Sequence, residues 1–293
     1  MSLRATAIGF TAILMWSTLA LLTTLTGRVP PLQLTAMAFS VAFSIGLFFW
    51  IGRGENPKDL LRLPWPVWLL GVGGLFGYHL FYFMALRNAP AVQASLIAYL
   101  WPLLIVLFSS LLPGENLRWY HLIGALFGFA GAVVLVGGGE MLGFDREYVP
   151  GYLAALVSAL IWSTYSVLSR RWRTVPTSAV AGFCAVTAVL AWTSHFILEK
   201  TVWPAGWQWA AVVGLGIGPV GLAFYVWDWS VKHGDIKALG AISYLAPVIS
   251  TILLIIAGRA VASWDLAVAC GLIVGGAVLA SGDLRRRAPG TDT

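Results

Sequence analysis

Ten long stretches of this 293-residue chain contain no Lys, Arg, Asp or Glu. They span residues 5–27, 29–52, 63–86, 88–114, 119–139, 148–169, 174–198, 201–227, 238–258 and 266–282. About 20 apolar residues are needed to cross the hydrocarbon of a bilayer as a helix, and nine of the stretches exceed that length. The last stretch is marginal, but Trp264 extends it. We therefore predict ten transmembrane helices.

The composition excludes most other classes of protein. Charged residues are few, 18 Lys+Arg and 12 Asp+Glu, whereas 59% of the chain is hydrophobic. Soluble and disordered chains carry more charge, and two cysteines are too few for a disulfide scaffold. Since the stretches are apolar on all sides, they predict helices rather than the alternating strands of a barrel. The expected fold is an all-α polytopic membrane protein whose first helix is retained, because no cleavage signal follows it.

The positive charges are divided unequally between the loops. With ten spans, 13 Lys and Arg residues fall on the side of the two termini and five fall on the other side. Cytoplasmic loops of membrane proteins carry the excess of Lys and Arg. We therefore expect both termini in the cytoplasm. The net charge of +6 follows from this topology, so no nucleic-acid partner is expected.

The chain repeats itself at an interval of about 145 residues. The matching segments, in the same order in both halves, are Trp16-Ser17-Thr18 with Trp162-Ser163-Thr164, Phe81-Tyr82 with Phe224-Tyr225, Tyr99 and Pro102 with Tyr244 and Pro247, Trp119 with Trp264, and Gly131-Ala132-Val133 with Gly276-Ala277-Val278. This order predicts a duplication. We expect one five-helix repeat in residues 1–147 and a second, with a basic tail, in residues 148–293. An odd number of helices inverts the second repeat in the membrane, an architecture of secondary transporters with the substrate site between the repeats.

These features together resemble the drug/metabolite transporter superfamily, EamA type. The resemblance covers essentially the whole chain and rests on Trp-Ser-Thr in the first helix of each half and on a proline in the fourth helix of each half. Within the superfamily, the chain is most similar to exporters of aromatic and other amino acids. The resemblance implies a bacterial inner-membrane exporter with alternating access. It also implies a central cavity between the halves, with helices 1, 3, 4, 6, 8 and 9 around it.

Two prolines lie near the middle of their stretches, Pro102 in the fourth and Pro247 in the ninth. A proline removes one backbone donor and displaces the carbonyl four residues earlier. In lipid the freed groups need a partner, and paired breaks in the two halves of a transporter point to its binding site. We interpret these prolines as gating hinges beside the cavity. The alternative is a static kink in a packed helix.

Aromatic, hydroxyl and imidazole side chains gather near these prolines. Polar groups that face lipid are costly, so these groups are expected to face protein or water. Ser95, Tyr99 and Pro102 share one helix face at spacing i, i+4 and i+7, and facing rings would form an amphipathic cavity wall. The alternative for each ring is packing between helices. The candidate substrate-binding residues are Trp16, Ser17, Tyr78, His79, Tyr82, Ser95, Tyr99, Trp101, Trp162, Ser163, Tyr225 and Tyr244.

The charge-free interior also constrains the substrate. A charge at the centre of a transmembrane helix costs about +2.5 to +3.5 kcal/mol on the insertion scale and is retained for function. A carrier of cations is expected to hold a carboxylate, and a carrier of phosphorylated compounds a Lys or Arg. Their absence from the stretches predicts a neutral or zwitterionic substrate such as an amino acid. Neutral sugars, purines or hydrophobic drugs are the alternative.

Other roles lack the groups that they require. Without a catalytic acid, a metal cluster or an oriented Ser–His pair, we expect no enzymatic activity, no cofactor and no metal. His79 is interpreted as a hydrogen-bonding partner rather than a proton carrier, which favours facilitated export. Asp228, near Lys232, is interpreted as part of a gate or as a solvated helix end. Ten helices with an internal repeat can complete a pore as a monomer in the lipid bilayer.

Four pairs of glycines have the spacing that lets helices approach closely. They are Gly73 and Gly77, Gly124 and Gly128, Gly214 and Gly218, and Gly271 and Gly275. We expect each pair to lie at a helix–helix contact.

Overall fold

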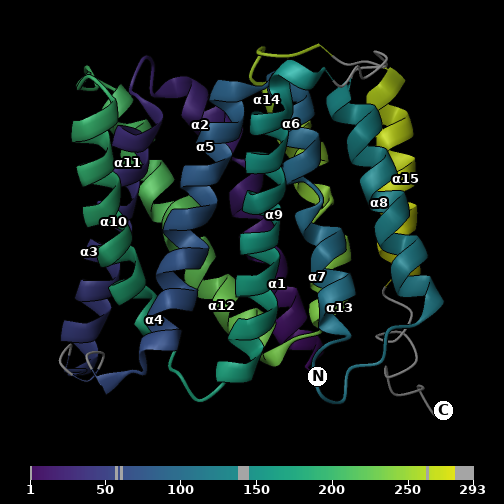
Figure 1. Ribbon diagram of the computed structural model, residues 1–293, viewed down its shortest axis with the longest axis horizontal. Coiled ribbons are helices and arrows are strands. Elements are labelled where there is room, and N and C mark those ends of the chain that lie inside the picture. The colour runs from purple at the N-terminus through teal and green to yellow at the C-terminus, as the bar shows by residue number, and fades with distance from the viewer. Residues whose placement is uncertain (1, 57–58, 60–61, 138–144, 262–263, 281–293) are drawn as a thin grey trace.

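The computed structural model describes residues 2–56, 59, 62–137, 145–261 and 264–280, which form a bundle of helices running between two opposite ends (Figure 1). Nine helical segments of this described part are long and apolar enough to cross a membrane, and a tenth, Trp264–Ala280, is shorter. The prediction of an all-helical membrane protein with ten spans is confirmed. The predicted basic tail lies outside the described residues.

Several spans are built from more than one helix. In the first half, the five spans are α1 (Leu3–Ser17) with α2 (Leu19–Leu25), α3 (Pro31–Arg53), α4 (Trp65–Val72) with the π-helix η2 (Gly73–Gly77) and α5 (Tyr78–Asn88), α6 (Ala91–Ala98) with α7 (Trp101–Ser109), and α8 (Trp119–Gly137). In the second half, they are η3 (Arg146–Tyr148) with α9 (Val149–Ser169) and η4 (Arg170–Trp172), α10 (Ala179–Leu198), α11 (Gln208–Ile217) with the π-helix η5 (Gly218–Leu222) and α12 (Ala223–His233), α13 (Ile236–Ile242) with α14 (Leu245–Ile256), and α15 (Trp264–Ala280).

Helix ends follow local sequence signals. α3 begins at Pro31, whose fixed φ suits the first turn of a helix, and is followed by Gly54 in the left-handed conformation, with φ 66°. α13 begins after Asp235, whose carboxylate accepts hydrogen bonds from the backbone N–H groups of Lys237 and Ala238, both at 3.1 Å. The sequence therefore determines where these spans start and stop.

The two halves carry the same irregularities at equivalent positions. The third and eighth spans each contain a one-turn π-helix, Gly73–Gly77 and Gly218–Leu222. The fourth and ninth spans are each interrupted shortly before the repeated proline, between α6 and α7 and between α13 and α14. Equivalent helices of the two halves make equivalent contacts across the bundle. α5 of the third span packs on α9 of the sixth, and α12 of the eighth span packs on α1 of the first. The second and seventh spans, α3 and α10, pack along each other, as do the fifth and tenth, α8 and α15. The bundle therefore consists of two five-helix repeats.

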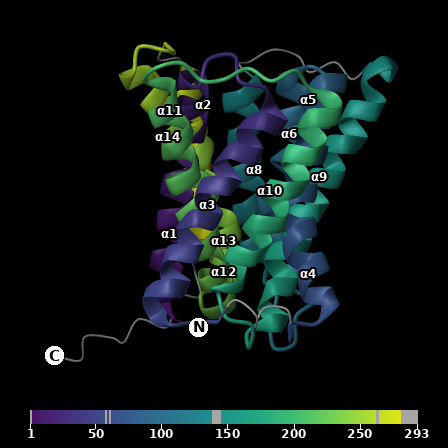
Figure 2. The ribbon, with the colours of Figure 1, turned by 90° about the vertical axis from the view of Figure 1, so that its left-hand side faces the viewer.

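The two repeats begin at opposite ends of the bundle. We call the end that carries the N-terminus the terminal end and the opposite end the distal end. α1 begins at the terminal end, where the N-terminus lies (Figures 1 and 2). α9 begins at the distal end, with Gly151 against Asn88 of α5. It is followed at the terminal end by Arg170, whose Nη1 donates to the Gly234 carbonyl (2.8 Å) beside Thr6 of α1. The second repeat is therefore inverted.

Glycines permit a close contact between α8 and α15. A Cβ on Gly124 would lie 2.5 Å from the carbonyl oxygen of Gly276, and a Cβ on Gly276 would collide with the Gly124 carbonyl. Gly128 is equally tight against Tyr244. The packing prediction is wrong for four other glycines, because a Cβ there would meet nothing within 4 Å: Gly73, Gly218, Gly271 and Gly275.

Adjacent glycines of α15 offer a matched test of this contact. Gly276→Ala should lower the thermal unfolding temperature in detergent, because the new methyl group meets fixed backbone atoms and overpacking costs about 1–3 kcal/mol. Gly275→Ala should leave that temperature unchanged or raise it slightly, since the site is open. Equal effects of the two substitutions would contradict the described register of α8 and α15.

Candidate functional site

A cavity of about 690 Å³ lies between the two repeats. Its lining comes from the first, second, third, fourth, sixth, eighth and ninth spans. Trp16, Trp101 and Trp162 line it near the middle of the bundle, whereas Pro31 and Arg87 line it at the distal end. The side chain of Arg87 is 50% exposed, so the cavity reaches the surface at this end. Pockets for small molecules have volumes of about 300–1,000 Å³.

Tryptophan rings form the floor of the cavity. The ring centroids of Trp16 and Trp162 are 5.6 Å apart, and those of Trp16 and Trp101 are 6.1 Å apart. Trp227 packs against Trp16 at 5.0 Å, away from the cavity lining. Trp16 Nε1 donates to the carbonyl of Pro219 in the π-helix η5 (3.0 Å), so its polar edge is satisfied. The floor is therefore an apolar surface of fixed rings.

Stacked rings form two sides of the cavity. Tyr78 and Tyr82 of α5 are nearly parallel, with centroids 5.9 Å apart and an interplanar angle of 3°. Phe39 of α3 and Phe224 of α12 are stacked in the same way, at 5.7 Å and 5°. Offset rings of this kind offer flat faces against which another ring can pack.

Polar groups are present on the wall of α5 and α6. The Tyr82 hydroxyl and Ser95 Oγ are 3.4 Å apart. His79 Nδ1 lies 2.7 Å from the Leu75 carbonyl. Because a carbonyl oxygen only accepts, Nδ1 carries the proton, and in the neutral ring Nε2 is then an acceptor. The wall thus offers hydroxyl groups and one imidazole acceptor to a ligand.

The structure brings eight of the twelve predicted site residues to this cavity, namely Trp16, Tyr78, His79, Tyr82, Ser95, Tyr99, Trp101 and Trp162. The other four lie outside its lining. Ser17 and Ser163 are fully buried, and each hydroxyl donates to a carbonyl four residues earlier in its own helix at 2.8 Å. The Tyr225 hydroxyl donates to the Ala42 carbonyl of α3 (3.3 Å). These groups are satisfied by protein and do not face the cavity.

Tyr244, the fourth of these residues, contacts a helix break. Its ring is fully buried beside α8 and α15, and its hydroxyl accepts a hydrogen bond from the backbone N–H of Leu103 (3.2 Å). In a continuous helix this N–H would bond to the Tyr99 carbonyl. Tyr244 of the second repeat therefore supports the interruption before Pro102 in the first repeat.

Sequence reasoning missed two contributors to the cavity. α3 lines it through Thr35 and Phe39, although the second span was not expected there. Arg87 also lines it, which corrects the expectation that the site holds no Lys or Arg. Arg87 is the first residue after the charge-free stretch 63–86, so a count of uncharged residues placed it outside the membrane.

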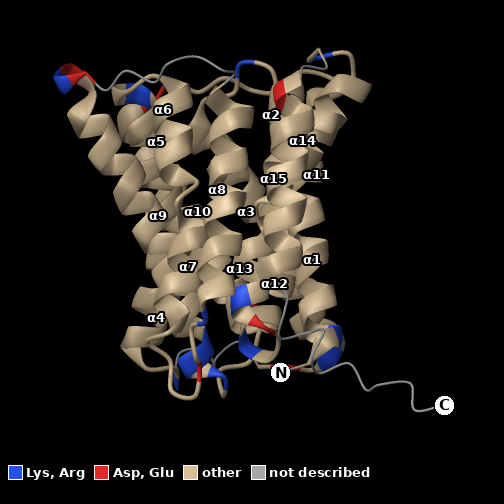
Figure 3. Cartoon of the chain, turned by 90° about the vertical axis from the view of Figure 1, so that its right-hand side faces the viewer, with Lys and Arg blue, Asp and Glu red and all other residues tan. Residues whose placement is uncertain are grey.

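Buried ion pairs close the bundle at the terminal end, where blue and red segments meet in Figure 3. Glu115, in the loop between α7 and α8, pairs with Arg170 (2.9 Å) and Lys237 (3.1 Å), and Asp228 pairs with Lys232 (2.7 Å). All five side chains are at most 10% exposed. Asp228 is therefore not a solvated helix end. No group of three His, Cys, Asp or Glu suited to a metal ion occurs in the described part of the chain.

Comparisons with known proteins agree with this architecture. The sequence pattern of the EamA-like transporter family matches residues 3–137 and again residues 149–282. A protein of Ancylobacter novellus named "Aromatic amino acid exporter YddG" is 59% identical over 280 residues, which cover 94% of this chain and 96% of that protein. Proteins of the same name are 26% identical in Salmonella typhimurium (86% of this chain, 88% of that one) and 24% identical in Escherichia coli (94% and 96%). A crystal structure at 59% identity superposes with a TM-score of 0.91 and covers 95% of this chain and 98% of that one.

The hydrogen bond across the helix break gives a prediction. Tyr244→Phe should destabilise the protein by about 1–3 kcal/mol, because the buried Leu103 N–H loses its acceptor. Thermal unfolding in detergent measures the effect. Tyr148→Phe, which also removes a tyrosine hydroxyl, is the control and should unfold like the parent. A Tyr244→Phe variant as stable as the parent would show that the break does not depend on this bond.

Proposed function

This chain belongs to the EamA-like transporter family, and we propose that it exports amino acids, aromatic ones included, across a bacterial inner membrane. The family match confirms the resemblance that was drawn from the Trp-Ser-Thr repeats and the paired prolines. The chain is therefore a multi-pass membrane transporter. One observation carries the choice of substrate: the cavity between the repeats is walled by indole and phenol rings. The 59%-identical relative named as an aromatic amino acid exporter supports that choice.

The proposed site is formed by the eight predicted residues that line the cavity. A substrate ring packs against the faces of Tyr78 and Tyr82 or against the tryptophan floor. An ammonium group is attracted to indole faces and donates to Tyr hydroxyls or to His79 Nε2. The lack of a carboxylate among the described lining residues disfavours purely cationic substrates. A zwitterion with an apolar side chain therefore fits this wall best.

The proposed mechanism is alternating access. The cavity reaches the surface at the distal end, whereas indole rings and buried ion pairs close the terminal end. Because the repeats are inverted copies with matching π-helices and broken spans, exchanging their conformations would open one end and close the other. We propose Pro102 and Pro247 as the hinges of this exchange, since each lies within the first three residues after a break.

The proposed orientation places the terminal end in the cytoplasm. The sequence supports this assignment, because sorting the loops by ten spans puts 13 Lys and Arg on the side of the termini and five on the other side. The distal opening then faces away from the cytoplasm, as expected for the release state of an exporter. We further propose that the repeats divide at residues 147 and 148 and that one chain suffices for transport, because a single chain contributes the whole lining.

Flux into liposomes tests the substrate. Purified protein should carry radiolabelled phenylalanine, threonine and methionine with saturation, and neutral sugars and purines should not compete. Tyr99→Ala and Trp101→Ala should raise KM for phenylalanine by about tenfold, a loss of roughly 1.4 kcal/mol of ring contact. Tyr225→Phe, outside the cavity, should transport like the parent. Absence of saturable flux for every amino acid would overturn the proposed substrate class.

Chemical accessibility tests the closed terminal end. Glu115→Gln should weaken the closure, because losing a partner in a buried ion pair costs about 3–5 kcal/mol. Ser109→Cys, fully buried at the end of α7, is the reporter in a background without Cys184 and Cys270. When Glu115→Gln is added, the reporter cysteine should react with a maleimide several-fold faster than it does with Glu115 in place.

The control for this experiment is Glu55→Gln. Glu55 pairs with Arg53 at 3.9 Å on an exposed surface, where such pairs contribute little. It should leave the reaction rate unchanged. If Glu115→Gln also left the rate unchanged, the ion pairs would not hold this end closed.

A further inference from the structure

One charged side chain reaches the cavity. Among the lining residues that the structure describes, Arg87 alone carries a formal charge. It lies near the end of α5, one to two turns beyond Tyr82 and Phe83, which also line the cavity. At 1.5 Å per residue, the Cα atoms of Tyr82 and Phe83 lie about 6–7.5 Å along the helix axis from the Cα atom of Arg87. This spacing is comparable to the length of an aromatic amino acid.

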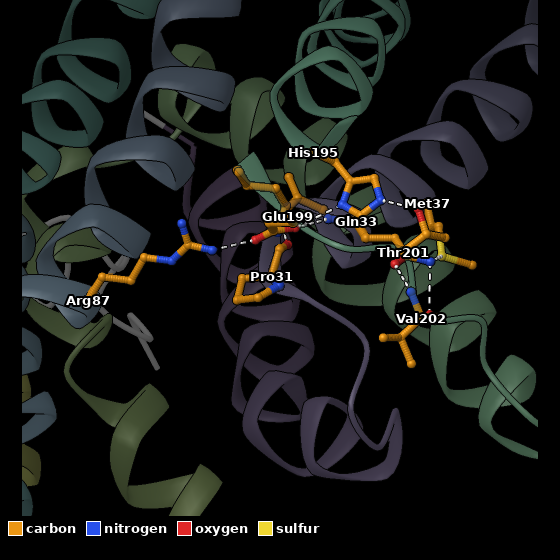
Figure 4. A network of polar contacts seen from close by, with 10 residues as sticks. Pro31, Gln33, Met37, Arg87, His195, Glu199, Thr201 and Val202 are labelled. Carbon is orange, nitrogen blue, oxygen red and sulfur yellow. Dashed lines mark hydrogen bonds and ion pairs between the residues drawn. The ribbon is translucent and has the colours of Figure 1, made fainter. Parts of the chain in front are cut away.

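A buried carboxylate holds this guanidinium in place (Figure 4). Arg87 Nη2 donates to Glu199 Oε1 at 2.9 Å, and the side chain of Glu199 is only 2% exposed. Glu199 in turn accepts from the backbone N–H groups of Leu32 and Gln33 (3.1 Å each) and lies 3.0 Å from His195 Nδ1. The carboxylate is therefore stabilised by the first turn of α3 as well as by Arg87.

Further contacts make the support of Glu199 rigid. His195 Nε2 lies 2.9 Å from Thr201 Oγ1. The side-chain amide of Gln33 bonds to both backbone groups of Val202, donating to the carbonyl at 3.0 Å and accepting from the N–H at 2.9 Å. Glu199 thus belongs to a network that joins α3, α10 and residues 199–202, whereas Arg87 is attached to that network by one contact.

Most of the hydrogen-bonding capacity of Arg87 remains available. A guanidinium has five N–H donors in a planar fork that matches a carboxylate. Within the described part of the chain, one of its nitrogens has a polar partner, Glu199 Oε1. The side chain is half exposed and borders the cavity. The remaining donors can therefore bind an anionic group inside the distal half of the cavity.

We propose that Arg87 binds the carboxylate of the transported amino acid in the distal half of the cavity and that Glu199 positions it. The inference rests on the proposed amino-acid substrate. The ring of the substrate packs near Tyr82 and Phe83 while its carboxylate meets the guanidinium fork. Arg87 then makes the carrier select for molecules with a carboxylate and against their amides, which lack the negative charge.

The test compares phenylalanine with phenylalaninamide, which lacks the carboxylate, in liposomes containing the full chain. The parent should have a KM for phenylalanine roughly tenfold or more below that for the amide, as expected for a hydrogen-bonded charge. Arg87→Gln should raise KM for phenylalanine and lower KM for the amide, so that their ratio falls toward one. Arg87→Lys, which keeps the charge but loses the planar fork, should give an intermediate ratio.

Arg28→Gln is the matched control, because Arg28 is exposed in the distal loop between α2 and α3 and does not line the cavity. It should retain the parental ratio. A purely structural role of Arg87 would change KM for both compounds by the same factor and leave the ratio unchanged, which would overturn the proposal. An equal preference in the parent would also overturn it. If the parent carries neither compound, the proposed substrate class fails first, and the proposal on Arg87 fails with it.

Discussion

The cost of placing a charge or an unpaired polar group in hydrocarbon governs the structure of this chain. In the part of the chain that the structure describes, it confines Lys, Arg, Asp and Glu to the two ends of the bundle and leaves the middle to apolar and aromatic side chains. Buried charges in the described part of the chain are paired or hydrogen-bonded: Glu115 pairs with Arg170 and Lys237, and Asp235 accepts from the backbone at the start of α13. The cavity follows the same rule. Aromatic rings form its walls, and the one charged lining residue that the structure describes, Arg87, lies at its distal end and is paired with Glu199.

Backbone groups obey the same rule, and this links the fold to transport. Each half contains a π-helix in its third span and an interruption in its fourth span. Two backbone groups at these irregularities bond to side chains of the other repeat: Leu103 N–H donates to the Tyr244 hydroxyl, and the Pro219 carbonyl accepts from Trp16. The irregular points, which we propose as hinges, are therefore also points at which the two repeats contact each other.

The sequence predicted the features that depend on long segments. Charge-free stretches gave the number of spans, and the interval of about 145 residues gave the inverted repeat. The sequence did not predict as well which residues of a helix face the cavity or a neighbouring helix. This depends on the rotation of the helix about its axis, and neighbouring residues differ by about 100° in direction. Phe224 lines the cavity while its neighbour Tyr225 bonds to α3, and Gly276 rather than Gly275 meets α8. Arg87 was missed because a long side chain at a helix end extends into the cavity from outside the charge-free stretch.

The central claim is that a small zwitterion binds between the repeats, with its ring against the aromatic walls. The most direct measurement is a crystal structure of this chain with bound phenylalanine. It should contain the ligand within the 690 Å³ cavity, in contact with rings such as Tyr78, Tyr82 and Trp101. Phenylalanine bound only outside this cavity, in a crystal grown at a saturating concentration of it, would contradict the claim.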